Sequence, residues 1–268
     1  MLLAIDVGNT ETKLGFFARE SGALDLWKTW RVTTALRRTS DEFGVLFRAL
    51  FRGSDIPTET VEAIVVASVV PQLDRELVSA CRAYFPRSRT PHHFSAATQT
   101  LLEVATDRPK ELGADLLAGA VAARLLYGDP VVIVGFGTAT TFSAVAGGRY
   151  LGAAIAPGIQ ISIDALAART AKLPQVALEA TNGVIGRDTV GALQAGIVFG
   201  FVGQTEGIVA RMRSEIGSGA KVVATGGLAD VIAKHTRSID AVEPNLVLLG
   251  LREYYTRVSN MGFASEAE

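Results

Sequence analysis

The sequence predicts an α/β protein built as a duplicated unit, with two lobes and a cleft between them. Apolar runs of strand length alternate with amphipathic helical stretches along the 268 residues. Two patterns also recur in the same order. Residues 2–17 and 131–145 each predict a strand, a tight glycine turn and a second strand, while residues 63–73 and 221–232 each predict a buried strand leading into a helix. Because both patterns recur in order, we favour duplication over chance similarity between valine-rich strands.

The composition argues against several classes of protein. With 26 Lys and Arg against 27 Asp and Glu, the formal net charge is −1, so no overall field attracts nucleic acid or an acidic membrane surface. The single cysteine, Cys81, excludes an intramolecular disulfide and a Cys-based zinc site, and it suits a reducing cytoplasm. Apolar stretches are interrupted well before about 18 residues, so we expect no membrane span and a cytoplasmic location.

In the first half, strands precede and alternate with helices. Apolar residues at helical spacing predict helices near 40–52 and 72–84. The segment 86–109 is rich in Pro, Thr, Ser and Arg and predicts a connecting loop. Strands are expected near residues 2–7, 13–18, 25–32 and 63–67.

The second half repeats this alternation after a helix. An apolar stripe predicts that helix over 113–127. The strands expected next lie near 131–135, 139–146, 149–155 and 221–224. The remaining helices are expected near 158–172, 187–216, 227–236 and 246–258.

The first turn, Asp6 to Thr10 with Lys13 beyond it, predicts a phosphate-binding site. Gly8 lets the backbone approach a ligand, and exposed N–H groups in such turns can form an anion-binding nest. Asp6 could hold a hydrated Mg²⁺, and Lys13 could meet a phosphate. The alternative is a β-hairpin turn with a polar tip.

The second turn repeats the first with one change. Gly137 and the following Thr138 to Thr141 offer N–H groups and hydroxyls to phosphate oxygens, although threonine also favours strands. Gly135 stands where Asp6 stands in the first copy, so no side chain there can bind a cation. The pair Gly226-Gly227 permits either close approach of a flat ligand such as adenine or simply a tight turn.

Two acidic positions lie at predicted helix starts. Asp115 falls in the first turn of its helix, where a carboxylate complements the helix dipole. A general base facing a cleft is the functional alternative, and periodicity alone favours the structural role. Asp188 or Thr189 is expected to cap the long helix that follows.

Taken together, these motifs resemble the type III pantothenate kinase family, within the superfamily of acetate and sugar kinases, Hsp70 and actin. The likeness runs along nearly the whole chain. It implies two ribonuclease H-like lobes, residues 1–112 and 113–268, and a homodimer with the substrate pocket at the dimer interface. The matching segments, in chain order, are IDVGNTETKLG, VVASVVPQL, PKELGAD, GFGTATTF, YLGAAIAPGI, Leu173-Pro174, IGRDTVGALQAGIVFGFVG, VVATGGLAD and PNLVLLGL.

The resemblance also implies a role for individual residues. Asp115 would be the catalytic base that accepts the hydroxyl proton of pantothenate, and Asp6 would hold Mg²⁺. The phosphates of ATP would be contacted by Asp6, Val7, Gly8, Asn9, Thr10, Lys13 and Thr138. The pantothenate site would be lined by Gly113, Ala114, Asp115, Leu116 and Thr189.

Four positions depart from the family pattern. Leu116 replaces an Arg that would pair with the substrate, and Gly135 replaces the Asp that binds K⁺ or NH₄⁺, so we expect the monovalent cation site to be lost. Thr106 stands where a Tyr is common, and Ser143 where an Asp is usual. The expected function is ATP-dependent phosphorylation of pantothenate to 4′-phosphopantothenate, the first step of coenzyme A biosynthesis. The alternatives are an impaired or regulatory homologue that binds nucleotide, and a kinase of another small hydroxyl compound.

Overall fold

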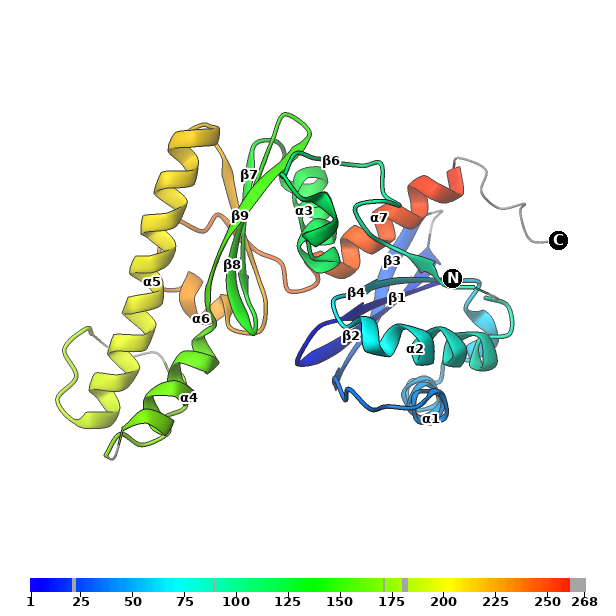
Figure 1. Ribbon diagram of the computed structural model, residues 1–268, viewed down its shortest axis with the longest axis horizontal. Coiled ribbons are helices and arrows are strands. Elements are labelled where there is room, and N and C mark those ends of the chain that lie inside the picture. Colours follow the sequence, from blue (N-terminus) through cyan, green and yellow to red (C-terminus); the bar gives the residue numbers. More distant parts are fainter. Residues whose placement is uncertain (21–22, 89, 171, 180–182, 261–268) are drawn as a thin grey trace. The chain divides into compact units, whose positions relative to one another are not determined.

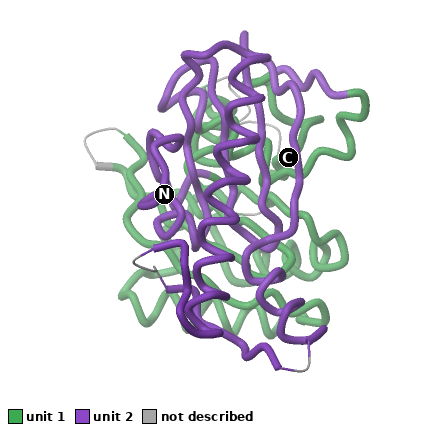
Figure 2. Tube along the Cα trace, turned by 90° about the vertical axis from the view of Figure 1, so that its left-hand side faces the viewer, with its two compact units in different colours: residues 1–102, 107–122, 247–268 green, residues 103–106, 123–246 purple. Residues whose placement is uncertain are grey.

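The computed structural model describes residues 1–20, 23–88, 90–170, 172–179 and 183–260. The chain divides into two compact units, which Figure 2 shows in different colours. Unit 1 comprises residues 1–102, 107–122 and 247–268, and unit 2 comprises residues 103–106 and 123–246. The sequence places a single boundary between residues 112 and 113, whereas the compact units are interleaved along the chain.

Unit 1 contains a five-stranded sheet in the order β3-β2-β1-β4-β5 (Figure 1). The first three strands form an antiparallel meander, and β4 and β5 add in parallel on the other side of β1. β1 is buried along its whole length, which explains its unbroken apolar run. The strands are β1 (Leu2–Val7), β2 (Glu11–Glu20), β3 (Ala23–Thr33), β4 (Ala63–Ser68) and β5 (His92–His93).

Helices α1 (Ser40–Arg52) and α2 (Pro71–Tyr84) pack on the apolar core of this sheet. α1 begins with a capping box, in which Thr39 and Glu42 satisfy each other's backbone N–H groups. Short 3₁₀ turns η1 (Thr58–Thr60) and η2 (Pro109–Glu111) join the larger elements. The core of unit 1 is rich in phenylalanine, with rings stacked or edge-on between Phe43, Phe47, Phe51 and Phe85.

Helix α3 (Ala114–Tyr127) begins in unit 1, and α7 (Leu246–Asn260) returns the chain to it. The two helices approach closely at Gly250, where an added Cβ would overlap the carbonyl oxygen of Ala118. Glycine is therefore required at this crossing, because a larger residue would push the helices apart. The start of α3 is thus held by a helix from the far end of the chain.

Unit 2 contains a six-stranded sheet in the order β11-β10-β7-β8-β9-β6. Apart from the added edge strand β6, this is the order and direction of the sheet in unit 1. The duplication that the sequence predicts is therefore confirmed at the level of topology. The strands are β6 (Glu103–Val104), β7 (Val131–Phe136), β8 (Ala139–Ala146), β9 (Arg149–Pro157), β10 (Lys221–Thr225) and β11 (Ala241–Val242).

The helices of unit 2 are α4 (Ile159–Arg169), α5 (Thr189–Ile216) and the short α6 (Ala229–Ala233). Asp188 caps α5 by accepting a hydrogen bond of 2.7 Å from the N–H of Gly191, as the sequence suggests. Among the described residues, α5 is the one helix whose length and composition would allow it to cross a membrane. Its buried face, however, joins the core of unit 2 through Ile197, Phe201 and Val209. That packing is typical of a core helix.

The predicted helices and the longer strands are present, with ends that differ by a few residues. The sequence missed the two-residue strands β5 and β6, which lie inside the predicted loop 86–109, and also β11. It also made α6 too long, because the helix spans only Ala229–Ala233. Strands of two residues are too short to show the alternation that reveals longer ones.

Candidate active site

The turn between β1 and β2 is held by hydrogen bonds within the turn and by others from the residue that follows β3. The N–H of Gly8 donates to the carbonyl of Glu11 over 3.1 Å. Thr34, one residue past β3, donates its N–H to the carbonyl of Thr10 (2.9 Å) and its hydroxyl to the carbonyl of Gly8 (2.7 Å). The hydroxyls of Thr34 and buried Thr12 lie 2.9 Å apart and share a further hydrogen bond. Sequence reasoning missed Thr34, whose only signal is a polar residue directly after the predicted strand.

Asp6 lies beneath this turn, and its side chain is only 8% exposed. It faces Lys13 across the β1–β2 pair. Burial and, to a smaller extent, the charge of Asp115 raise the pKa of Asp6, while Lys13 lowers it, and the net result is a pKa of about 7. The structure therefore brings three predicted site residues, Asp6, Lys13 and Asp115, within electrostatic reach of one another in unit 1.

Asp115 is the second residue of α3, and its side chain is half-buried. Burial raises the pKa of this carboxyl group, while hydrogen bonds from the backbone N–H groups of Leu116 and Asp115 lower it. The carboxylate folds back over Gly113, where an added Cβ would lie 2.5 Å from Oδ1. Both sequence interpretations of Asp115 are therefore compatible: the carboxylate binds the helix start and also lies within electrostatic reach of Asp6.

The neighbours of Asp115 supply apolar surface rather than charge. Ala114 is buried, and Leu116, at the position of the family Arg, is half-buried.

In unit 2, the hydroxyl of Thr106 is buried without a hydrogen-bond partner in the described part of the chain. A buried hydroxyl of this kind leaves a donor and an acceptor available to a ligand.

The turn between β7 and β8 in unit 2 is held by close backbone contacts. The N–H of Gly137 donates to the carbonyl of Ala139 over 3.1 Å, and the hydroxyl of Thr140 donates to Pro157 over 3.2 Å. An added Cβ at Gly158 would overlap the carbonyl oxygen of Thr138, and one at Gly226 would overlap that of Phe136. Gly226 also has a φ of +98°, so the glycines after β10 form a tight turn against this backbone.

The surroundings of Gly135 do not match a monovalent cation site. Gly135 contributes no side-chain oxygen, and the hydroxyl of Thr141 lies 2.5 Å from the position that its Cβ would take. The hydroxyl of Ser143 is buried and shares a hydrogen bond of 3.0 Å with Tyr150. The carboxylates that the family resemblance implies at positions 135 and 143 are absent, and the hydroxyl of Ser143 is engaged by Tyr150.

The carboxylates in unit 1 fit a divalent cation better. The described residues hold no cluster of three or more His, Cys, Asp or Glu side chains that could bind a metal alone. Mg²⁺, however, usually takes only one or two protein carboxylates and completes its shell with water and substrate phosphates. Asp6 and Asp115 repel each other in a desolvated place, and a cation would relieve that repulsion.

Thr189 is exposed at the first position of α5, behind the cap residue Asp188. Thr138 lies in the β7–β8 turn. Both belong to unit 2, whereas the residues around Asp115 belong to unit 1. The roles of Thr138 and Thr189 therefore stay predictions.

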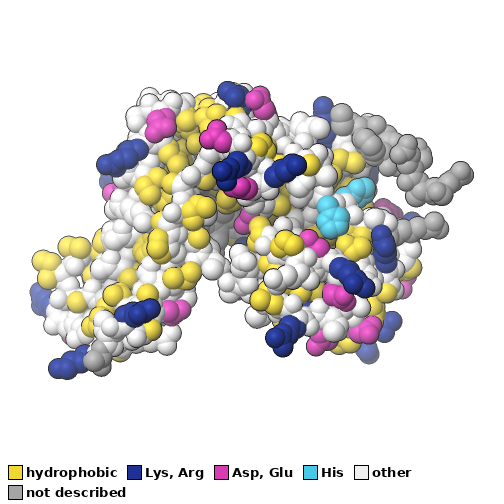
Figure 3. All heavy atoms as spheres, viewed as in Figure 1, with side chains coloured by type: hydrophobic (Ala, Val, Ile, Leu, Met, Phe, Trp, Pro, Cys, Tyr) yellow, Lys and Arg dark blue, Asp and Glu magenta, His cyan; other side chains and the backbone are white. Residues whose placement is uncertain are grey.

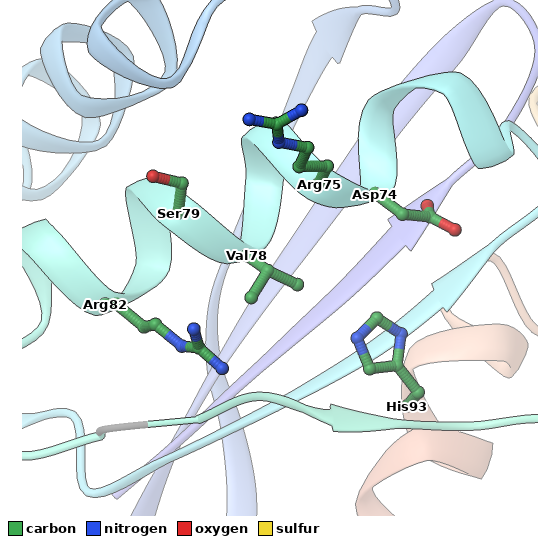
Figure 4. A pocket seen from close by; sticks show the side chains of 6 residues that line it. All are labelled: Asp74, Arg75, Val78, Ser79, Arg82 and His93. Atoms are coloured by element: carbon green, nitrogen blue, oxygen red, sulfur yellow. The ribbon is translucent and has the colours of Figure 1, made fainter.

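Two surface grooves within unit 1 lie away from these residues. One, of about 460 Å³, runs along α2 beside β5 (Figure 4). It combines solvated Arg75 and Arg82 with Asp74, one of whose carboxylate oxygens is buried without a partner. A second groove of similar volume runs between α1 and η1. Neither contains a residue that the sequence assigned to the site.

Comparison with known proteins identifies relatives along the whole chain. A family model described as type III pantothenate kinase matches residues 2–211. The type III pantothenate kinase of Moorella thermoacetica is 45% identical over 258 residues, covering 96% of this chain and 99% of the relative. That of Myxococcus xanthus is 47% identical over 258 residues, covering 96% of this chain and 98% of the relative.

Solved structures resemble the fold at lower identity. A Baf family protein from Campylobacter jejuni superposes with a TM-score of 0.55 at 18% identity, covering 96% of this chain and 99% of that one. An ethanolamine utilization protein from Carboxydothermus hydrogenoformans gives 0.52 at 13% identity, with coverages of 94% and 89%. At such identities the likeness concerns the fold alone.

Proposed function

Because the chain belongs to the type III pantothenate kinase family, we propose that it phosphorylates pantothenate with ATP, giving 4′-phosphopantothenate, the first step toward coenzyme A. The observation that carries this proposal is the arrangement in unit 1. The carboxylate of Asp115 lies over Gly113 and within electrostatic reach of Asp6, and the turn between residues 8 and 11 follows the strand that carries Asp6.

Asp115 is the base of the reaction. The hydroxyl oxygen of pantothenate attacks the γ-phosphorus of ATP, the bond from that phosphorus to the β-phosphate oxygen breaks, and ADP leaves. The hydroxyl proton passes to the carboxylate of Asp115. Burial makes that carboxylate a stronger base than an exposed aspartate, because it disfavours the charged form.

The turn and its flanking residues hold the phosphates. Phosphoryl transfer needs mainly alignment and neutralisation of charge. Lys13 supplies a positive charge, and the exposed backbone N–H of Asn9 supplies a donor. Mg²⁺, held by Asp6, would neutralise phosphate charge when bound. Thr138 is the residue of unit 2 that we expect to contact the same phosphates.

Gly113, Ala114, Leu116 and Thr189 are the residues that we expect to contact pantothenate. Leu116 provides no donor for the carboxylate of pantothenate, so binding there relies on neutral groups. We therefore expect a higher KM for pantothenate than in an enzyme with Arg at this position. Replacing Leu116 with Arg should lower that KM.

The donor set at Gly135 does not fit K⁺ or NH₄⁺, so we expect catalysis without a requirement for either ion. The buried free thiol of Cys81 is compatible with a cytoplasmic location.

A homodimer is the expected assembly, formed through the exposed face of α5. On that face the Cβ positions of Gly196, Gly200 and Gly203 meet no other atoms within 4 Å.

The proposal is tested by an assay of ADP release with purified protein, ATP, Mg²⁺ and pantothenate, in buffers of K⁺ and of Na⁺. Mass spectrometry of the product should show one added phosphoryl group. Asp115→Asn is the matched control and should lose turnover while still binding ATP. Turnover with other small alcohols but not with pantothenate would favour another substrate, and ATP binding without any turnover would favour a regulatory homologue.

A further inference from the structure

Thr34 connects the end of β3 to the β1–β2 turn through both its backbone and its side chain. Its N–H and its hydroxyl bind the carbonyl oxygens of Thr10 and Gly8, at 2.9 and 2.7 Å. Its hydroxyl also meets that of Thr12 at 2.9 Å. Two carbonyl groups of one short turn are therefore held by a single residue.

Fixing a carbonyl also fixes the N–H of the same peptide bond. In a planar trans peptide the C=O and the following N–H point in opposite directions. With the carbonyl of Gly8 held toward Thr34, the N–H of Asn9 must point to the opposite side. Asn9 is exposed, and its N–H has no partner among the residues that the structure describes. A directed, unpaired N–H is what an anion needs.

The corresponding place in unit 2 holds a residue without a side chain. Glu11 pairs with Thr33, which puts Thr34 opposite Thr10. Ala139 pairs with Pro157, which puts Gly158 opposite Thr138. A Cβ added to Gly158 would overlap the carbonyl oxygen of Thr138, so no side chain fits there. The side-chain contact that Thr34 makes with the turn is therefore particular to unit 1.

We infer that Thr34 is a positioning residue, which holds the β1–β2 turn so that the N–H of Asn9 points at a phosphate of the bound nucleotide. The inference rests on the proposed function, because it takes this turn as the phosphate site. It adds Thr34, a residue outside the motifs, which acts through the turn that it contacts.

The test compares three variants of the full-length protein. Thr34→Val keeps the shape and the backbone N–H but removes both hydroxyl contacts, and Thr34→Ser restores them. Thr33→Val is the matched control, because Thr33 is exposed one residue earlier. We measure the Kd of ATP and of inorganic tripolyphosphate by calorimetry, and KM separately for ATP and pantothenate.

Thr34→Val should weaken binding of both ligands about tenfold, the size expected for one misdirected hydrogen bond to an anion. KM for ATP should rise with it, while KM for pantothenate stays unchanged, and Thr34→Ser should recover most of the loss. Unchanged nucleotide binding in a folded Thr34→Val protein would overturn the inference, as would an equal effect of Thr33→Val.

If Thr34→Val does not fold, Thr34→Ala and Thr34→Ser are compared in the same way, and equal ATP affinity in these two would overturn the inference. Turnover with pantothenate tests the proposed function separately. A protein that binds ATP in a Thr34-dependent manner but does not phosphorylate pantothenate would support the role of Thr34 and contradict the proposed function.

Discussion

At the scale of single residues, the space above Gly113 determines where the proposed base lies. An added Cβ would come within 2.5 Å of Asp115 Oδ1, and Val69 lies 3.7 Å from the same position. Gly113 has no left-handed φ, so alanine fits its backbone and the only conflict is with the carboxylate. The substitution therefore tests the position of one functional group.

We expect Gly113→Ala to lower kcat about a hundredfold, within the range that a general base contributes, and to leave the Kd of ATP nearly unchanged. Steady-state kinetics and calorimetry measure the two. Gly219→Ala is the control, since nothing lies within 4 Å of its Cβ position. In an Asp115→Ala background, Gly113→Ala should have little further effect, and a full additional loss there would contradict a role through Asp115.

Asp6 predicts an unusual pH dependence of stability. Its pKa is about 7 in the folded protein, against 3.8 for an ordinary aspartate. Between these values the native state holds a proton that the unfolded state has lost, so this group lowers stability as pH rises through that window. The penalty is absent below pH 3.8 and complete above about pH 7.

At pH 8, the free energy of unfolding of Asp6→Asn should therefore exceed that of the wild type by up to about 4 kcal/mol. This difference should shrink toward pH 4. Urea unfolding at several pH values measures it. Asp25→Asn, at an exposed position of β3, is the control and should show no such trend. A difference that stays constant with pH would show that Asp6 does not titrate as described.

At the scale of elements, the crossing of α3 and α7 fixes the start of the helix that carries Asp115. The Cβ of an alanine at position 250 would overlap the carbonyl oxygen of Ala118. Gly250→Ala should lower the free energy of unfolding by about 1–3 kcal/mol, because the helices must separate. Arg257→Ala, at an exposed position of α7, should change it little. Thermal unfolding compares the two, and equal stability would show that the crossing adjusts without cost.

The sequence predicts elements well where they are long and periodic. The hairpin of β1 and β2 follows from alternation around a glycine turn, and its register alone puts Lys13 opposite Asp6. The nearness of Asp115 to Asp6 could not be derived in this way, because it depends on how α3 packs against residues more than a hundred positions away. The role of Thr34 could not be predicted for the same reason, since Thr34 follows β3 and its hydrogen-bond partners belong to the β1–β2 hairpin.

At the scale of the whole molecule, α5 presents a face of small and apolar residues that is exposed among the residues that the structure describes. In the view of Figure 3, hydrophobic side chains lie on the part of the surface that α5 forms. Near its start, Ile185 and Val190 are 84% and 45% exposed. Small residues allow two helices to approach closely, and a two-fold dimer would bring this face against its copy.

Gly200→Arg should convert the expected dimer to a monomer, because the charged side chain would fill the space between the paired helices. Light scattering after size-exclusion chromatography measures the mass. Glu215→Arg, at an exposed position of α5 on another side of the helix from the glycine stripe, is the control for added charge. A wild-type protein that elutes as a monomer at micromolar concentration would contradict the assembly.

The interleaving of the two units has a consequence for synthesis on the ribosome. The strands of unit 1 precede α7 in the sequence, yet Leu248 and Tyr254 of α7 pack against Gly15 and Phe94. These apolar contacts cannot form until α7 has been synthesised. A nascent chain that stalls before residue 246 would expose this surface to chaperones and proteases, so the cell would recognise an incomplete copy by its uncovered first sheet.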